Sequence, residues 1–149
     1  MTNVKIRRVT LNDKAVWLRM RIALWHHHDP KELEQELDRL LTNQAKEPVF
    51  VAERSDKGLC GFIEVAIREK AAGCKTNNVG YIEGWYVDPD IRQKGIGRRL
   101  VDAAENWARE QGCQEMASDT NNKYPISRTA HQSLGYEEIQ TSFHYRKLL

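Results

Sequence analysis

The sequence lacks any apolar run long enough to cross a bilayer. Its apolar runs all fall short of the ~18 residues that a membrane-spanning helix needs. The first ten residues, MTNVKIRRVT, contain basic side chains but no apolar segment and no small-residue cleavage site after them, so a secretory signal pattern is missing. We therefore expect a cytoplasmic protein without a membrane partner.

Cysteine is scarce, and charge of either sign is not in excess. The three cysteines, Cys60, Cys74 and Cys113, are irregularly spaced and form no C-x-x-C pair. An odd number of thiols cannot close fully into disulfides, so free thiols in a reducing compartment are the plain interpretation. The net charge is only +2, and the basic residues are mixed with acidic ones. This pattern gives no support for a nucleic-acid partner.

The composition is that of an ordinary globular domain. Of the 149 residues, 40% are apolar and 30% are charged. This length suits one core, and we find no internal repeat and no linker rich in proline, glycine or serine. We therefore expect residues 1–149 to form a single domain.

Apolar spacing and turn residues predict a mixed order of helices and strands. Helices are expected at about 10–24, at 29–41, from about 96 to 112 and at 126–134. Strands are expected at about 4–9 and at 48–54, 59–68, 79–87, 113–120, 136–139 and 142–146, with a loop at 69–78. The strand, helix, strand unit in the middle predicts a parallel or splayed pair within an α/β mixed sheet. Gly84 lies inside one strand, where a bulge or a close backbone approach is the usual reason.

A glycine loop joins the strand at 79–87 to the next helix. Residues 88–100 read DPDIRQKGIGRRL and contain R-x-x-G-x-G from Arg92 to Gly97. The first N–H groups of a helix are unpaired and lie at the positive end of its dipole, which favours a phosphate. The loop does not match G-x-x-x-x-G-K-[ST], and Leu100 replaces the third glycine of a dinucleotide fingerprint. The hexad alone also fits a solvated turn, but its position between a strand and an amphipathic helix favours a binding loop.

The stretch YIEGWYVDPDIRQKGIGRRLVDAAENWA resembles the acyl-CoA-binding core of the GNAT superfamily of N-acetyltransferases. With GCQEMASDT, HQSLGYEE and the final YRK, the chain is similar to the short bacterial aminoglycoside 6'-N-acetyltransferases from about Trp25 onward, most densely between Gly80 and Glu138. The resemblance implies a GNAT fold, in which a mostly antiparallel sheet with one splayed parallel pair is flanked by about four helices. It also implies acetyl transfer from acetyl-CoA to the 6'-amine of drugs of the kanamycin and tobramycin type, which confers resistance, and a homodimer.

The resemblance assigns two backbone segments to acetyl-CoA. Pantetheine is expected to pair with the backbone of Trp85, Tyr86 and Val87, where the sheet splays. The pyrophosphate is expected on amides of the glycine loop, in agreement with the preference of anions for helix N-termini. A Cβ at Gly95 or at Gly97 is expected to obstruct the approach of the pyrophosphate to these amides. The loop residues are Gln93, Lys94, Gly95, Ile96, Gly97 and Arg98.

The resemblance assigns the acceptor side to two acids and two rings. Glu83 and Asp119 match substrate-contacting acids, and Asp119 is expected to accept the amine proton directly or through water. Without the resemblance, a solvent-facing strand residue and a cap after a strand are the favoured interpretations of Glu83 and Asp119, and the resemblance reverses that preference. Trp25 and His28 match a W-x-x-H pattern that lines the acceptor site. No metal is expected, because adjacent histidines in the HHHD run cannot all turn to one ion.

Three positions depart from the family pattern. Lys70 stands where relatives have a tyrosine in the loop before the cofactor strand. Tyr124 replaces an asparagine that contacts the cofactor, and Gln140 replaces an acid that helps to bind the substrate. Tyr124 is one hypothetical proton donor to the leaving thiolate, and water is the default donor. Two other functions stay open: acetylation of a polyamine or a protein N-terminus, and acyl-CoA binding without turnover.

Overall fold

The computed structural model of the chain describes residues 3–56, 58–119, 125–139 and 146–148. Within them, five strands form one sheet in the order β1-β2-β3-β4-β5. Strands β1 to β4 are antiparallel, and β5 pairs with β4 in parallel, which confirms the mixed sheet. The strands are β1 (Val4–Arg8), β2 (Val49–Arg54), β3 (Gly58–Arg68), β4 (Val79–Val87) and β5 (Met116–Ser118).

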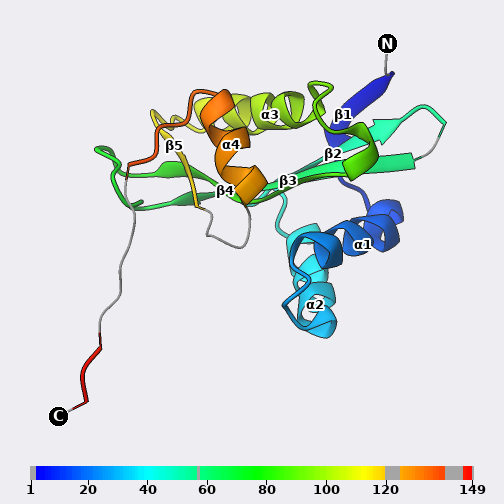
Figure 1. Ribbon diagram of the computed structural model, residues 1–149, viewed down its shortest axis with the longest axis horizontal. Coiled ribbons are helices and arrows are strands. Elements are labelled where there is room, and N and C mark those ends of the chain that lie inside the picture. Colours follow the sequence, from blue (N-terminus) through cyan, green and yellow to red (C-terminus); the bar gives the residue numbers. More distant parts are fainter. Residues whose placement is uncertain (1–2, 57, 120–124, 140–145, 149) are drawn as a thin grey trace.

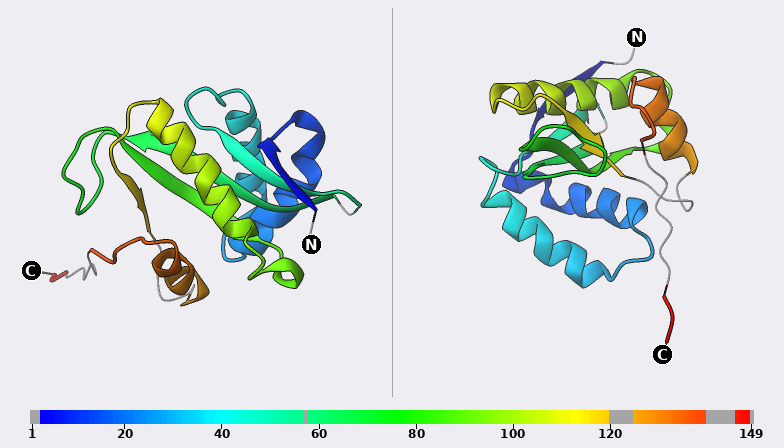
Figure 2. Two further views of the ribbon diagram at one scale, coloured as in Figure 1. Left: turned by 90° about the horizontal axis from the view of Figure 1, so that it is seen from above. Right: turned by 90° about the vertical axis from the view of Figure 1, so that its left-hand side faces the viewer.

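Helices cover both faces of this sheet (Figures 1 and 2). Helices α3 and α4 lie on one face, and α1 and α2 lie on the other. None of the described helices is long and apolar enough to cross a bilayer. The helices are α1 (Lys14–Leu24), α2 (Pro30–Leu41), α3 (Ile96–Glu110) and α4 (Pro125–Ser133), with short 3-10 turns η1 (Leu11–Asp13) and η2 (Pro89–Ile91).

The helix ends follow from local sequence signals. The Asp13 carboxylate accepts a 2.8 Å hydrogen bond from the backbone N–H of Thr10, and Asp29 accepts one of 3.0 Å from Lys31. Both carboxylates satisfy N–H groups that a helix start leaves free. Past the end of α3, Gly112 has φ +88, a conformation that favours glycine. The predicted helix boundaries are therefore confirmed to within a few residues.

The sheet separates two apolar cores. One lies under α3, and the other lies under α1 and α2. Buried members of the first include Ile63, Val65, Ile82, Leu100, Val101 and Trp107. Buried members of the second include Trp17, Met20, Leu37, Val49, Val51 and Phe62.

A one-residue bulge interrupts β4. Glu64 of β3 pairs with Gly84, and the next residue, Val65, pairs with Ile82, so Glu83 is an extra residue in β4. Because side chains alternate along a strand, one extra residue reverses which positions face each core. The bulge predicted at the interior glycine is confirmed.

The reversal is visible in the packing on either side of the bulge. Ile82 belongs to the core under α3, and after the bulge Trp85 and Val87 join that same core. Tyr86 belongs instead to the core under α1 and α2. Gly84 faces α1 as well, since an ideal Cβ there would lie 2.6 Å from Cη2 of Trp25. A close approach therefore accompanies the bulge at this glycine.

The parallel pair opens beyond the bulge. Pairing between β4 and β5 ends at Ile82 and Ser118, although β4 continues to Val87. The N–H of Asp88 donates to the carbonyl of Cys60 in β3. Since alternate residues of a strand send their N–H groups to the same side, those of Trp85 and Val87 point away from β3 into the opening. The predicted splay is confirmed.

The carboxyl-terminal strands were predicted less well. Of the strand expected at 113–120, Met116–Ser118 is confirmed, residues 113–115 and Asp119 are not in a strand, and residue 120 lies outside the described residues. The strand expected at 136–139 is wrong: the N–H of Tyr136 closes the end of α4 on the carbonyl of His131, and its hydroxyl donates to Glu105 at 2.6 Å. The N–H of Tyr136 is therefore not available for pairing with a neighbouring strand. Of the strand expected at 142–146, residues 142–145 lie outside the described residues, and Arg146 is not in a strand.

A buried ion pair that the sequence analysis missed joins α1 to the sheet. Arg21 is 1% exposed and Glu64 is 3% exposed. The Arg21 guanidinium donates to Glu64 at 3.2 Å, and the Trp17 indole N–H donates to Glu64 at 3.0 Å. Burial raises the pKa of Glu64 to about 7, in opposition to the attraction of Arg21 and the bond from Trp17.

This raised pKa predicts a pH dependence of stability that Glu64→Gln removes. The folded-state pKa lies above the ordinary value of 4.5. The contribution of Glu64 to stability is therefore complete below that value and is lost as the pH rises through about 7. Between about pH 5 and 8, we expect the free energy of unfolding of the native chain to fall by roughly 1–3 kcal/mol more than that of the variant. Urea unfolding at a series of pH values measures this difference, and parallel pH profiles would contradict it.

Candidate functional site

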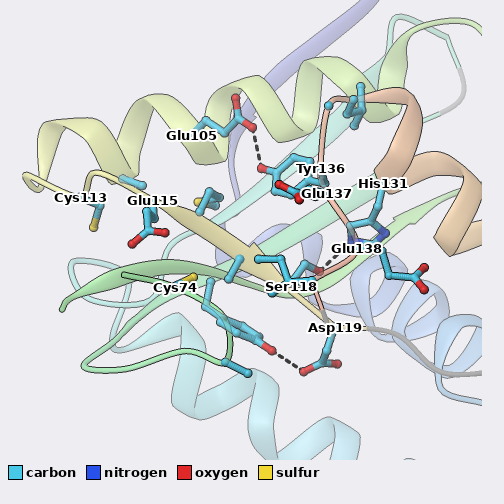
Figure 3. A pocket seen from close by; sticks show the side chains of 18 of the residues that line it. Cys74, Glu105, Cys113, Glu115, Ser118, Asp119, His131, Tyr136, Glu137 and Glu138 are labelled. Atoms are coloured by element: carbon cyan, nitrogen blue, oxygen red, sulfur yellow. Dashed lines mark hydrogen bonds between the residues drawn. The ribbon is translucent and has the colours of Figure 1, made fainter. Parts of the chain in front are cut away.

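The two predicted acids lie close together, linked by two residues that the sequence analysis did not single out. Glu83 comes from the bulge, and both of its carboxylate oxygens accept hydrogen bonds from Arg68 at 2.5–2.9 Å. The Arg68 guanidinium lies 3.5 Å from the centre of the Tyr81 ring. The Tyr81 hydroxyl donates to Asp119, just past β5, at 2.5 Å (Figure 3). The bulge thus places Glu83 on Arg68, and Tyr81 connects that guanidinium to Asp119.

Burial raises the pKa values of Glu83 and Tyr81. It raises the pKa of Glu83, Asp119 raises it further, and the Arg68 guanidinium works against both. Burial together with the hydrogen bond to Asp119 raises the pKa of the Tyr81 hydroxyl above its ordinary value. Tyr81 therefore stays protonated at neutral pH and serves as a donor, while Glu83 holds a proton more readily than a solvated carboxylate does.

Trp25 packs on the bulge of β4 from the end of α1. It caps the C-terminus of α1, and its ring edge packs on Gly84, next to Glu83. The Phe62 ring lies 6.2 Å away and supports it from β3. His28 is exposed, with its ring 6.5 Å from that of Trp25. The structure therefore brings Trp25 to the bulge and leaves His28 at the outer side of the ring.

The glycine loop forms the start of α3, a helix of 15 residues. Gly95 has φ +83 and Gln93 has φ +63, so the chain turns sharply into the helix and leaves its first amides without intrahelical partners. The N-terminus of such a helix suits an anion. The pyrophosphate contacts of Lys94, Ile96 and Arg98 stay predictions.

The structure gives a separate reason for each loop glycine. An ideal Cβ on Gly95 meets nothing within 4 Å, so its backbone conformation is the local requirement. At Gly97 the Cβ would lie 3.1 Å from Cζ2 of Trp85. A Cβ at Gly97 would thus crowd an indole of the protein itself, and the predicted obstruction of the cofactor at both glycines stays a prediction.

Trp85 of β4 meets His131 of α4 and carries a donor that is unpaired within the described part of the chain. The Trp85 ring lies 5.2 Å from the ring of His131, edge to face. The Trp85 Nε1 is buried and has no hydrogen-bond partner among the described residues. A buried donor costs stability until it is paired. Together with the free amides of β4 and α3, it fits a thioester cofactor with an amide-bearing arm and a pyrophosphate.

A cavity of about 890 Å³ opens beside β5. Its size lies in the ordinary range for small-molecule sites, roughly 300–1,000 Å³. His131 projects into it from α4, with Nε2 2.8 Å from the Ser118 hydroxyl and Nδ1 2.6 Å from the Ser127 carbonyl (Figure 3). The cavity reaches Asp119 and Tyr81, but the glycine loop, Glu83 and Trp25 do not line it. It therefore covers only the β5 side of the candidate site.

Sequence signals for the missed residues exist in part. Tyr81 lies two positions before Glu83 on the same strand face, and Arg68 ends the neighbouring strand, so pairing β3 with β4 brings them together. Among the departures, Lys70 is exposed in the loop after β3. Tyr124 and Gln140 lie outside the described residues. Over the described ranges, no group of three or more His, Cys, Asp or Glu side chains is arranged to hold a metal ion.

The fold and the site define an acyl-CoA-dependent N-acetyltransferase architecture. The model of the acetyltransferase (GNAT) family matches residues 14–136, and the chain belongs to that family. This confirms the GNAT fold and the family resemblance.

The relatives narrow the class further. The chain is 40% identical to an aminoglycoside N(6')-acetyltransferase type 1 of Klebsiella aerogenes, over 97% of this chain and 96% of the relative. It is 36% identical to an enzyme of the same name from Stenotrophomonas maltophilia, over 95% and 91%.

Solved structures agree with these relatives. AAC(6')-Iy, in complex with the bisubstrate analogue CoA-S-monomethyl-acetylneamine, superposes with a TM-score of 0.87 at 32% identity, covering 99% of this chain and 100% of the other. AAC(6')-Ih from Acinetobacter baumannii superposes with a TM-score of 0.87 at 31% identity, covering 99% of each chain. AAC(6')-Iy is thus seen with the CoA moiety. This confirms acetyl-CoA as the predicted cofactor.

The Arg68 contact predicts a measurable pKa change. In Arg68→Gln, the guanidinium that lowers the pKa of Glu83 is removed, while burial and Asp119 still raise it. We expect the Glu83 pKa to rise above that of the native chain. A carboxyl-carbon NMR titration of both proteins measures it, and an unchanged or lower value in the variant would contradict the assigned contact.

Proposed function

We propose that this protein transfers the acetyl group of acetyl-CoA to the 6'-amino group of aminoglycosides of the kanamycin and tobramycin type and so confers resistance. The observation that carries the proposal is the placement of two acids and an aromatic ring, Glu83, Asp119 and Trp25, where β4 and β5 part. A polyamino sugar needs carboxylates for its ammonium groups and an apolar face for its rings. The identity to enzymes that carry this name supports the same acceptor.

The cofactor side is formed mainly by backbone groups. Acetyl-CoA supplies the activated acetyl group as a thioester. The amides from Gln93 through Arg98 bind its pyrophosphate at the N-terminus of α3. The backbone of Trp85, Tyr86 and Val87 binds the amide-bearing arm in the opening of the sheet. The N–H directed into the opening at Val87 is placed to stabilise the oxyanion of the tetrahedral intermediate.

The acceptor side prepares the amine. An ammonium group must lose a proton before its nitrogen can attack the thioester, and Asp119 accepts that proton directly or through water. Glu83 holds the sugar through charge-assisted hydrogen bonds, and Trp25 and His28 line the same side. Because Arg68 already occupies both oxygens of Glu83, an incoming ammonium competes with a guanidinium of the protein. The amine attacks the thioester directly, without an acetyl-enzyme intermediate.

The proposal also includes the location and the oligomeric state of the enzyme. Aminoglycosides act inside cells, and we infer a cytoplasmic protein that works as a homodimer to which its carboxyl-terminal segment contributes. Two other functions remain as outcomes of the test below: acetylation of a polyamine or a protein N-terminus, and acyl-CoA binding without turnover.

A thiol-release assay tests the proposed reaction. Purified protein with acetyl-CoA and kanamycin or tobramycin should release free thiol. Asp119→Ala should lower kcat at least about 100-fold, since general base catalysis contributes roughly 10²–10⁴-fold, while acetyl-CoA binding persists. Asp56→Ala, an exposed acid in the turn between β2 and β3, is the matched control and should keep full turnover. Acetyl-CoA binding without thiol release for any aminoglycoside would exclude the proposed function.

Two glycines with the same local geometry test the glycine loop. Gly95 and Gly58 have φ +83 and φ +75, and an added Cβ meets nothing within 4 Å at either one. We expect Gly95→Ala and Gly58→Ala to lose similar stability, about 1 kcal/mol each, through backbone strain. Only Gly95→Ala should also weaken acetyl-CoA binding, by about tenfold, measured by calorimetry. Equal acetyl-CoA affinities in the two variants would argue against a pyrophosphate site at this loop.

A further inference from the structure

The buried arginine of α1 is fixed from three directions. Arg21 donates to the backbone carbonyl of Leu33 at 2.7 Å, to Glu36 at 2.8 Å and to Glu64 at 3.2 Å. Its side chain is 1% exposed. A planar guanidinium with partners in several directions has little freedom to rotate. Arg21 therefore presents one fixed surface to whatever packs on it.

The ring that packs on this surface is Trp25, one helical turn later in α1. The Arg21 guanidinium carbon lies 4.8 Å from the centre of the Trp25 ring, within the range of a cation–π contact. The opposite constraint comes from the sheet, where Cη2 and Cζ2 of Trp25 lie 2.6 and 2.8 Å from the position that an ideal Cβ on Gly84 would take. The ring is thus confined between a fixed cation and the bulge.

The ion pair and the bulge belong to one unit. Glu64, the buried partner of Arg21, pairs across the sheet with Gly84 at the register shift. The extra residue of that shift is Glu83. One carboxylate under the bulge therefore holds the arginine that packs on Trp25, and the bulge itself directs Glu83 toward the same side.

We propose that Arg21 is a positioning residue for the acceptor: it sets the affinity for the aminoglycoside by fixing the Trp25 ring against the bulge, without contacting the drug itself. The proposal rests on the proposed function, because Trp25 is assigned to the acceptor side there. A lysine cannot replace Arg21, because an ammonium lacks the planar face and the fork that reaches Leu33 and Glu64 together.

The test separates positioning from stability. Arg21→Met alone leaves the Glu64 carboxylate buried without its partner and can fail to fold. Arg21→Met with Glu64→Gln removes both charges and keeps an acceptor for Trp17. We expect this double variant to fold, to keep its KM for acetyl-CoA within about twofold of the native value, and to raise the KM for kanamycin about 3- to 10-fold, the range a lost cation–π contact gives. Arg39→Met, on the exposed side of α2, is the matched control and should leave both KM values unchanged.

A mutant cycle decides whether Arg21 acts through the ring. In a Trp25→Ala background, the same double change should no longer alter the KM for kanamycin, because its intermediary is absent. Equal effects with and without Trp25, or an unchanged KM for kanamycin in the double variant, would overturn the positioning role alone. A native enzyme that acetylates no aminoglycoside would instead remove the proposed function, and the acceptor role of Arg21 with it.

Discussion

The extra residue in β4 is the constraint on which the candidate site depends. Glu83 has no partner of its own in β3, and its insertion exchanges the two faces of the strand at Gly84. An uninterrupted strand would keep strict alternation and would not present Glu83 and Gly84 together toward the layer of α1. The pairing with β5 ends at the same place, so the bulge coincides with the opening that exposes the backbone of β4.

The proposed sites for the anionic cofactor and for the cationic acceptor use different chemical groups around this opening. The N-terminus of α3 attracts an anion through backbone amides, which have no pKa near neutrality and retain their dipoles at every working pH. On the proposed acceptor side, burial raises the pKa of the Glu83 carboxylate and Arg68 lowers it. Because Arg68 also packs on Tyr81, a polycation has to displace or accommodate a cation that the fold itself has placed there.

The sequence predicted the helix ends and the bulge, which depend on local residue patterns. It missed the contacts that depend on how distant elements pack and pair. The start of α2 at Asp29 and the end of α3 before Gly112 follow from capping residues, and the interior Gly84 predicted the bulge. The strand at 136–139 was wrong because the N–H of Tyr136 closes the end of α4 and its hydroxyl donates to Glu105, tertiary contacts that strand propensity does not contain. Arg21 and Glu64 carried a signal, since each interrupts an apolar face. Their partnership required knowing that α1 crosses β3, and the contact of Arg68 with Glu83 required the register of two strands.

Amide hydrogen exchange with and without acetyl-CoA tests the central claim most directly, because it observes the opening in β4 residue by residue. The N–H groups of Trp85 and Val87 point into the opening, and that of Tyr86 points toward β3. Saturating acetyl-CoA should slow exchange at Trp85 and Val87 at least about tenfold more than at Tyr86, whose N–H already lies within the ladder. Unchanged exchange at both Trp85 and Val87 would contradict the account, because the cofactor would then bind elsewhere.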